Sequence, residues 1–379
     1  MTKDVLRPDH RGIATPRAGS RRRMLLFAAV LATSVAVAVG YAVHVSRRAD
    51  AAATAPSTVP VARLDALPQA GAEPSPESAA ARPYLLFRST ALGESYGRVS
   101  LAYLDAKRMD IAPGGERLVT PLQCDRVHYA GDHGICLEVK RAALTTYEAH
   151  IFDRNFKILH TLPLAGPPSR ARMSPDGRLA AVTVFVSGHS YGSPGFTTRT
   201  SVIDAASGRF LIDDLEKLEV LRDGSSFKAT DFNFWGVTFA RTGAEFYATL
   251  GTGGKTLLVQ GDLAERRMRV VRGDVECPSL SPDNTQVAFK RRVAMDTGGH
   301  VGWRLVVLDL ASGRETELTA ETRSVDDQVE WLGSQEIVYA LPADPLRSSA
   351  ATNSWALAID GASPPRLLLP FAFSPTVVR

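Results

Sequence analysis

Two hydrophobic patterns divide the chain. The segment from Met24 to Ser46 contains no Asp, Glu, Lys or Arg, and Met24–Val43 is a nearly unbroken apolar run of 20 residues. From Pro83 to Arg379, short apolar runs alternate with turns rich in Gly, Pro, Asp and Asn, and no long helical periodicity is present. The pattern predicts one long apolar helix followed by an all-β domain.

The apolar run is long enough to cross a membrane, because about 20 helical residues span a hydrocarbon core of roughly 30 Å. Seven Lys and Arg residues precede the run, and only Arg47 and Arg48 follow it closely. This bias places the amino terminus in the cytoplasm. We expect residues 1–23 to be a basic cytoplasmic tail, 24–46 a signal-anchor helix in the bacterial cell membrane, and the remainder of the chain to lie outside.

A cleaved signal is the alternative to a permanent anchor. Residues 49–53 offer small side chains for cleavage, and residues 20–25 partly match a twin-arginine export signal. Against cleavage, Arg47 and Arg48 stand between the run and these small residues, and a signal peptide usually has an apolar region of about 7–15 residues. Cleavage would release the β domain as a secreted protein.

The segment 47–82 is rich in Ala, Pro, Ser and Thr and contains no aromatic residue. Such a composition buries too little apolar surface to fold, and its prolines favour extended backbone. We therefore expect a disordered linker that holds the β domain away from the membrane.

An apolar strand that ends in Asp recurs through the β domain at intervals of 47 to 58 residues. An Asp in this position suits a turn, because its carboxylate can accept a backbone N–H group two residues later. We interpret these residues as turn formers and not as catalytic acids. They are Asp105, Asp153, Asp204, Asp262, Asp309 and Asp360.

A second signature precedes the Asp in each unit. The segment 174–177 reads Ser-Pro-Asp-Gly and leads into the apolar run 179–184, and 281–284 reads Ser-Pro-Asp-Asn and leads into 286–290. Weaker copies occur in the other units. Each unit thus contains four strands in about 50 residues, in the order strand, tight turn, strand, loop, strand, turn and strand. This is the order of elements in one blade of a β-propeller.

These signatures resemble the TolB-like (WD40-like, PD40) propeller repeats, over the range Pro83–Arg379. The resemblance implies a propeller fold and, from the family's role in the cell envelope, action through partner proteins. In this chain a membrane span and a linker stand where TolB carries a separate amino-terminal α/β domain.

The chain ends indicate how the ring closes. Phe371–Arg379 has the pattern of a first strand with nothing after it, and Pro83–Ser89 that of a second strand with no first strand before it. Joining the two removes exposed sheet edges. We expect six blades, at 371–379 with 83–123, then 124–168, 169–223, 224–275, 276–324 and 325–370.

Residues 188–192 read Gly-His-Ser-Tyr-Gly, the G-x-S-x-G pattern of α/β-hydrolases. A strand precedes the motif, but Ser193-Pro-Gly cannot begin the helix that a nucleophile elbow requires. We interpret the motif as a loop of the third blade, and Ser190 as a residue without a catalytic role.

Other catalytic and metal motifs are missing from the sequence. The eight histidines show no ligand spacing of two to four residues, and there is no P-loop, dinucleotide fingerprint or Ca²⁺ loop. His128 and His133 flank one turn and are expected at the surface, and Asp326-Asp327 is expected in a solvated turn. The sequence predicts no metal site, no cofactor and no catalytic residue.

The three cysteines are expected to be reduced and mostly buried. A straight hairpin places Cys136 opposite His128, four residues from Cys124, and four residues of strand span roughly 13 Å. Cys277 belongs to a different blade.

The formal charge of +4 is concentrated in the tail, because residues 1–48 carry nine basic and two acidic residues. The remaining chain carries 35 basic and 38 acidic residues, which argues against nucleic acid as a partner.

Long loops and connections offer the best candidates for a binding surface. In a propeller, loops between second and third strands share one face with the connections between blades, and loops carry function more often than strands. The candidates for this rim are His189, Tyr191, Lys228, Phe232, Asp296, His300, Trp303 and Arg347. We expect a binding scaffold or sensor that contacts another envelope protein, a peptide or a glycan. The alternative is a propeller-type hydrolase, lactonase or lyase with a polar site at the channel mouth.

Overall fold

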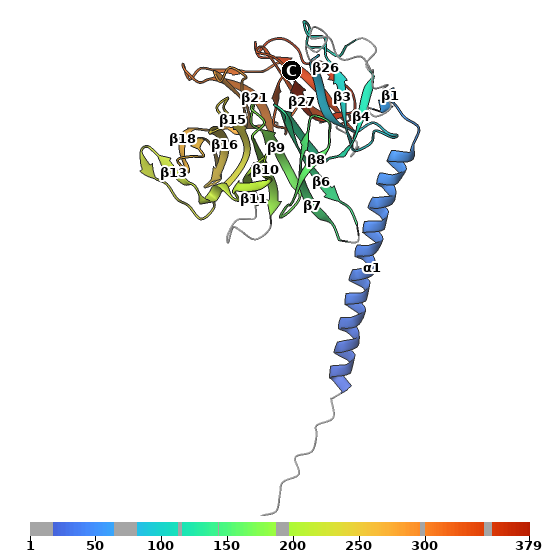
Figure 1. Cartoon of the computed structure of the whole chain (residues 1–379). Helices are drawn as coiled ribbons and strands as arrows, with labels where there is room; N and C mark the ends of the chain where they lie inside the picture. The colour runs from blue at the N-terminus through green and yellow to red at the C-terminus, as the bar shows by residue number, and fades with distance from the viewer. Residues whose placement is uncertain are drawn as a thin grey trace, which may run out of the picture.

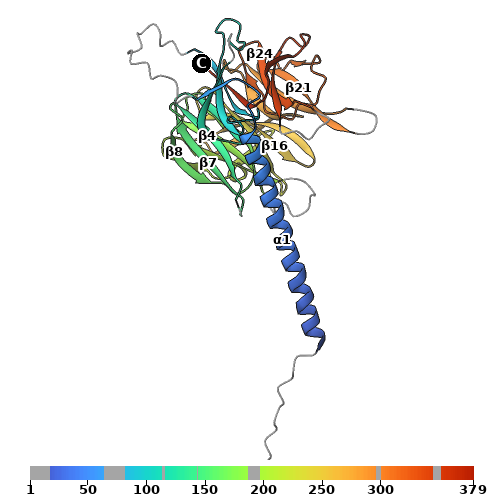
Figure 2. The ribbon, with the colours of Figure 1, turned by 90° about the vertical axis from the view of Figure 1, so that its right-hand side faces the viewer.

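A computed structural model describes residues 18–63, 82–112, 116–142, 144–186, 197–295, 300–344 and 351–379. One long helix stands beside a ring of six β-sheets, and each sheet is one blade of a propeller (Figure 1). The view turned by 90° shows the helix extending well beyond the ring (Figure 2).

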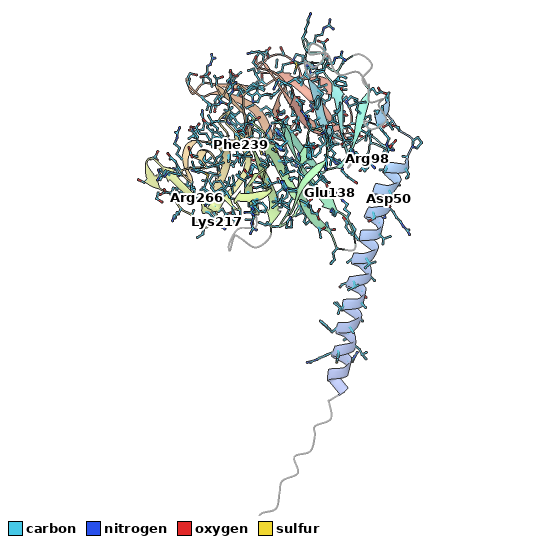
Figure 3. All side chains as sticks on the ribbon, viewed as in Figure 1. Asp50, Arg98, Glu138, Lys217, Phe239 and Arg266 are labelled. Atoms are coloured by element: carbon cyan, nitrogen blue, oxygen red, sulfur yellow. A yellow bond between two sulfur atoms is a disulfide. The ribbon has the colours of Figure 1, made fainter. Side chains whose placement is uncertain are left out.

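Helix α1 (Ala18–Thr54) contains the predicted apolar run. Its part from Arg22 to Thr54 reaches a mean hydropathy of 2.2 over a window of 18 residues, none of them buried. Its side chains project outward along most of its length (Figure 3). Length and composition allow this helix to cross a membrane, as an anchor or as a signal sequence.

The expected linker 47–82 is corrected at two places. Helix α1 continues to Thr54, since Ala51–Ala53 are strong helix formers. Strand β1 (Val61–Arg63) pairs in parallel with β4, and Val61 lies opposite Arg117. The remainder of the expected linker, residues 64–81, lies outside the described part of the chain.

The six blades follow the predicted order, and each runs from an innermost strand at the channel to an outermost strand at the rim. Blade one contains, in that order, β27 (Ala372–Val378), β2 (Tyr84–Ser89), β3 (Arg98–Tyr103) and β4 (Arg117–Gln123), with β1 at its outer edge. Blade two contains β5 (Arg126–Ala130), β6 (His133–Lys140), β7 (Thr146–Asp153) and β8 (Ile158–Pro163). Blade three contains β9 (Pro168–Met173), β10 (Leu179–Val186), β11 (Thr197–Asp204) and β12 (Arg209–Ile212).

Blade four contains β15 (Asn233–Phe239), β16 (Glu245–Thr252), β17 (Lys255–Asp262) and β18 (Arg267–Gly273). Blade five contains β19 (Glu276–Leu280), β20 (Gln286–Ala294), β21 (Val301–Asp309) and β22 (Glu315–Glu317). Blade six contains β23 (Glu330–Trp331), β24 (Glu336–Pro342), β25 (Thr352–Ala358) and β26 (Arg366–Leu369). After the short helix η2 (Leu215–Lys217), β13 (Glu219–Arg222) and β14 (Ser225–Ser226) extend the outer edge of blade four.

The predicted closure by the carboxyl-terminal strand is confirmed. Strand β27 pairs antiparallel with β2, from Tyr84 opposite Val378 to Ser89 opposite Ala372. Six hydrophobic clusters lie one between each pair of neighbouring blades, and one of them joins Leu85 of blade one to Val338 of blade six. The ring is therefore closed by both backbone pairing and side-chain packing.

The six recurring Asp residues are confirmed as turn formers. Each carboxylate accepts hydrogen bonds from backbone N–H groups two to four residues later, for example from Ser207 to Asp204 at 2.7 Å and from Ser312 to Asp309 at 2.8 Å. In the two strong Ser-Pro-Asp turns, Ser174 Oγ and Ser281 Oγ each accept an N–H group from the following strand at 2.9 Å.

The expectation of three reduced cysteines is wrong. Cys124 and Cys136 form a disulfide with a Cα–Cα distance of 5.4 Å, while Cys277 is free and buried. Cys136 pairs with Val127, and Cys124 lies before the start of β5. The chain does not continue straight there, because Asp125 donates its N–H to Leu137 at 2.7 Å and brings Cys124 back toward β6.

Candidate functional site

The innermost strands of the blades surround a central channel, and its two ends differ. We call the turn end the one formed by the turns between first and second strands, where Gly131, Pro175 and Pro282 lie. The connection end is the opposite one, where Arg126 and Asp327 mark the entry of the chain from one blade into the next.

A cavity of about 460 Å³ occupies the turn end. Its wall includes Tyr129, Phe239 and Trp331, which are almost fully buried. Figure 3 places Phe239 within the body of the ring. Arg241 and Arg379 lie on the same wall, where Arg241 donates to the carbonyl of Pro282 at 2.8 Å and Arg379 to that of Trp331 at 3.0 Å.

His128, Arg172 and Glu330 meet within the channel and also line this cavity. Arg172 Nη1 donates to Glu330 Oε2, and Arg172 Nη2 donates to the carbonyl of Val329 at 2.9 Å. His128 Nε2 lies 3.4 Å from Glu330 Oε2. The three side chains come from three blades, so that the ion pair joins opposite parts of the ring.

The hydrogen bonds of His128 define its protonation state. Its Nδ1 accepts the backbone N–H of Met173 at 3.1 Å, so Nε2 carries the proton and faces Glu330. Burial lowers the pKa of His128, which favours this neutral form. Burial alone would raise the pKa of Glu330, but the Arg172 guanidinium and His128 outweigh it and hold that pKa below its usual value.

The connection end is narrow, with a void of only about 20 Å³, and a network of ion pairs fills it. Arg126 Nη1 lies 3.2 Å from Asp327 Oδ1, and Asp327 Oδ2 accepts the N–H of Ala340 at 3.1 Å. Asp326 bonds with Lys290 and lies 3.4 Å from Arg170. Burial raises the pKa of the Asp326 carboxyl group, but Lys290, Arg170 and Arg126 together lower it by more. The carboxylate therefore stays ionised.

Two expectations are corrected by these contacts. Asp327 is 5% exposed and neutralises Arg126, so the expectation of a solvated position is wrong for Asp327, whereas the Asp326 side chain is 56% exposed as expected. His128 is 7% exposed and lies in the channel, not at the surface. Both residues are buried by closure of the ring, because His128 lies within the inner strand β5 and Asp327 in the segment that leads into the inner strand β23.

The predicted rim is only partly within the described residues. Among them, Trp303 Nε1 donates to Glu276 at 3.1 Å, and Lys290 Nζ lies 4.5 Å from the Trp303 ring centre. Phe232 packs against Phe227 and Phe234, with ring centres 5.2 and 6.0 Å apart.

None of the four rim residues within the described part of the chain lines the cavity. His300 accepts the N–H of Met295 at 2.7 Å through its carbonyl. His300, Lys228, Phe232 and Trp303 are absent from the cavity wall. The remaining candidates, His189, Tyr191, Asp296 and Arg347, lie outside the described residues, and the rim stays a prediction.

The sequence did contain a signal for the channel residues. Each lies two positions before the turn that ends an inner strand, and this is the same position in successive blades. Side chains two residues apart share a face of a strand. Aligning the weak repeats on that position would have collected His128, Arg172, Thr238, Ser279 and Glu330.

No protein-family model matches the chain, and no curated protein matches its sequence. Among solved structures, TolB from Acinetobacter baumannii is 14% identical with a TM-score of 0.50, and the match covers 78% of this chain and 66% of that one. A structure of a nidogen/laminin complex is 13% identical with a TM-score of 0.50, over 78% of this chain and 98% of that one.

A periplasmic gluconolactonase from Pseudomonas aeruginosa is 13% identical with a TM-score of 0.43, over 79% of this chain and 99% of that one. Identities this low show a shared propeller fold and nothing finer. The resemblance of the repeats to TolB-like propellers is therefore supported as a likeness of fold.

Proposed function

We propose that this chain is an envelope protein that is anchored in the bacterial cell membrane by α1 and binds a segment of another envelope protein in the cavity at the turn end of its channel. Three features support the proposal: the charge bias around the apolar helix, the disulfide, and the shape and lining of the cavity.

The disulfide supports a position outside the cytoplasm. Thiols are kept reduced in the cytosol, whereas disulfides form and persist in the periplasm and beyond. Cys124 and Cys136 are both about 1% exposed and already bonded. Together with the positive charge ahead of Met24, this favours a cytoplasmic amino terminus and an exported propeller.

The cavity carries the binding proposal. A volume of about 460 Å³ falls within the usual range of ligand pockets, roughly 300–1,000 Å³. The charged groups on its wall are Arg172, Arg241, Arg379 and Glu330, a net charge of +2 with His128 neutral. A wall that combines aromatic side chains with polar groups and carries excess positive charge suits a peptide segment that combines an apolar side chain with a carboxylate.

Binding is favoured over catalysis by the state of the titratable groups. Both nitrogens of His128 are engaged, and Glu330 is paired with Arg172. A general base needs a free, suitably tuned group within reach of a substrate proton. No described residue on the cavity wall forms a nucleophile–base pair with His128. The alternative of a hydrolase, lactonase or lyase would need a catalytic group from elsewhere in the chain.

Crosslinking in living cells tests the proposal, with the full chain as bait. We expect Arg241→Glu, which reverses a charge on the cavity wall, to abolish capture of the partner. Arg314→Glu is the matched control, because Arg314 is exposed on blade five and lies outside the cavity wall. Equal capture by both variants would contradict binding in the cavity.

A reporter fused after Arg379 tests the topology. It should be active outside the membrane, since the domain follows the helix on the side with fewer positive charges. Activity confined to the cytoplasm would contradict the proposed location.

A further inference from the structure

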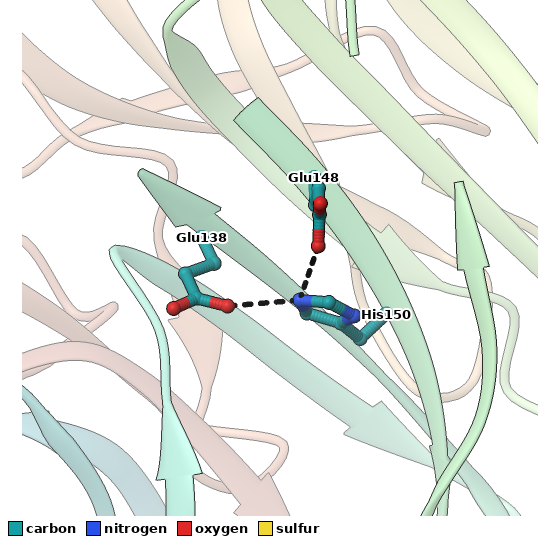
Figure 4. A group of neighbouring side chains, drawn as sticks. All are labelled: Glu138, Glu148 and His150. Carbon is teal, nitrogen blue, oxygen red and sulfur yellow. Dashed lines mark hydrogen bonds and ion pairs between the residues drawn. The ribbon is translucent and has the colours of Figure 1, made fainter. Parts of the chain in front are cut away.

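Blade two carries a cluster of one histidine and two glutamates that has no part in the channel. Glu138 on β6 lies directly opposite Glu148 on β7. His150 follows Glu148 by two residues and therefore shares its face of the sheet. One atom from each of the three side chains lies within 4.8 Å of the others, and the side chains converge on one point (Figure 4).

The distances match a metal site. His150 Nε2 lies 3.0 Å from Glu138 Oε2 and 3.6 Å from Glu148 Oε2. A tetrahedral zinc ion with bonds of about 2.1 Å holds its ligand atoms about 3.4 Å apart. Two of the three distances between ligand atoms are thus close to the edges of such a coordination sphere, and the third is below 4.8 Å.

The histidine is held in the orientation that a ligand needs. Its side chain is 5% exposed, and Nδ1 lies 3.0 Å from Thr161 Oγ1 on the next strand. A metal-binding imidazole commonly donates its second N–H to such an oxygen, which fixes the ring and leaves the other nitrogen for the metal.

The two carboxylates are neighbours of His150 and of the Lys140 ammonium, and they also face each other. Like charges directly opposite each other on neighbouring strands are destabilising. Glu148 Oε2 is buried and accepts no hydrogen bond of regular geometry, although the Lys140 ammonium lies 2.6 Å away. The Lys140 side chain is 45% exposed, so it can swing into solvent and leave both carboxylates to another cation.

The backbone beneath the cluster is fixed on both sides. Cys136 lies opposite His150 in the register and is tied to Cys124 by the disulfide. Asp125 Oδ2 accepts the N–H of Val139 at 2.8 Å, between Glu138 and Lys140. Ligands on such a rigid hairpin lose little conformational freedom on binding a metal.

We propose that Glu138, Glu148 and His150 form a binding site for a divalent transition metal, with zinc as the favoured ion. One imidazole nitrogen and two carboxylate oxygens suit zinc and its neighbours better than the all-oxygen preference of calcium or magnesium. The Glu side chains are 24% and 23% exposed, which leaves the fourth coordination position toward solvent. The pattern of a Glu, nine intervening residues and Glu-x-His is absent from the familiar metal motifs, so the sequence did not reveal it.

Calorimetric titration of the full chain in detergent with zinc chloride tests the site. We expect one equivalent of zinc to bind, and Glu138→Gln, Glu148→Gln and His150→Gln each to weaken it by at least about tenfold. His133→Gln, on the same strand β6 but outside the cluster, is the matched control and should leave the affinity unchanged.

Lys140→Ala separates a metal site from a merely structural ion network. It removes the competing ammonium and should tighten zinc binding several-fold, whereas a structural network would only lose stability. Thermal melting without zinc verifies that each variant folds. The proposal is overturned if the wild-type chain binds no zinc, or if the three ligand variants bind it as tightly as the His133→Gln control.

Discussion

The two ends of the channel are built from the same six inner strands, yet one is hollow and the other is filled. At the turn end the wall combines aromatic side chains with a few paired polar groups, and a cavity of about 460 Å³ remains. At the connection end, Arg126, Arg170 and Lys290 converge with Asp326 and Asp327, and only about 20 Å³ is left.

The two ends differ because they are formed by different parts of the blades. The turn end is made of repeated positions, so similar short turns recur around it and none reaches across the channel. The connection end receives chain segments that differ from blade to blade, and Asp326 and Asp327 come from one of them. The long connections therefore show where the sequence varies from blade to blade. The cavity lies at the opposite end of the channel.

The largest expected effect comes from removing the strand that serves both ends. Deleting residues 371–379 from the full chain takes away the pairing of β27 with β2, the buried Ala372, Thr376 and Val377, and the Arg379 contact in the cavity. Burial of the Val377 side chain alone is worth roughly 1.5–3 kcal/mol, and the unpaired backbone of β2 adds to the loss, which should therefore be a large part of a domain's 5–15 kcal/mol.

Thermal melting in detergent checks this truncation against a chain that lacks only Arg379. The shorter deletion should melt close to the wild type. Equal melting of the 371–379 deletion would mean that β27 is not part of the ring.

At the connection end, Asp327→Ala should destabilise the protein by about 3–5 kcal/mol, because it leaves the guanidinium of Arg126 buried without its partner. Burial already lowers the pKa of Arg126 to about 10. Asp327→Asn keeps an acceptor for the N–H of Ala340 and should cost less. Chemical denaturation measures both, and a loss below about 1 kcal/mol for Asp327→Ala would show that this end is solvated after all.

The disulfide fastens the connection end between blades one and two, and its loss should cost about 3 kcal/mol for a closed loop with a separation of 12 residues. Replacing Cys124 and Cys136 by Ala should reproduce the effect of a reductant on the wild type, and the double variant should not respond to the reductant. Thiol titration of the unfolded chain should find only Cys277, whereas three thiols would restore the expectation from the sequence.

Much of the fold was predictable because it is written in repeated local patterns. The turn chemistry of Asp204 and Asp309, and the strand pattern at both ends of the β domain, indicated the six blades and their closure. Each of these signals depends on residues that are neighbours in the sequence, and no long-range contact was needed to interpret them.

The site was less predictable because its residues meet only through the ring. His128, Arg172 and Glu330 come from three blades, and only an alignment of the weak repeats on the position two residues before each turn brings them together. The disulfide was missed for a related reason, since extrapolating a straight strand ignored the bend at Asp125. Local geometry decides that distance, and the hydrophobic pattern does not encode it.

A smaller effect on stability is expected from His128 in the channel, and it depends on pH. Since burial lowers the folded-state pKa of His128, an unfolded chain with the ordinary value of 6.5 takes up a proton that the folded chain refuses. The contribution of His128 to stability should therefore fall as the pH drops below 6.5, by at most about 1.4 kcal/mol at one unit below it.

Denaturation at pH 7.5 and 5.5 checks this contribution, with His128→Gln losing less stability than the wild type over that range. His133→Gln is the control and should follow the wild type. The pKa values of Asp326 and Glu330 are held below the usual 3.8 and 4.5, so their stabilising contribution is fully present over this range and is lost only at lower pH.

The smallest effect is expected at Ser190, which lies outside the described residues, between β10 and β11 in the sequence. If the Gly-His-Ser-Tyr-Gly motif there is only a loop, Ser190→Ala should change the free energy of unfolding by no more than about 0.5 kcal/mol, as surface substitutions usually do. A fluorophosphonate probe tests this directly: we expect no label on the wild type beyond that on Ser190→Ala. Covalent labelling that depends on Ser190 would identify an enzyme and contradict the proposed binding function.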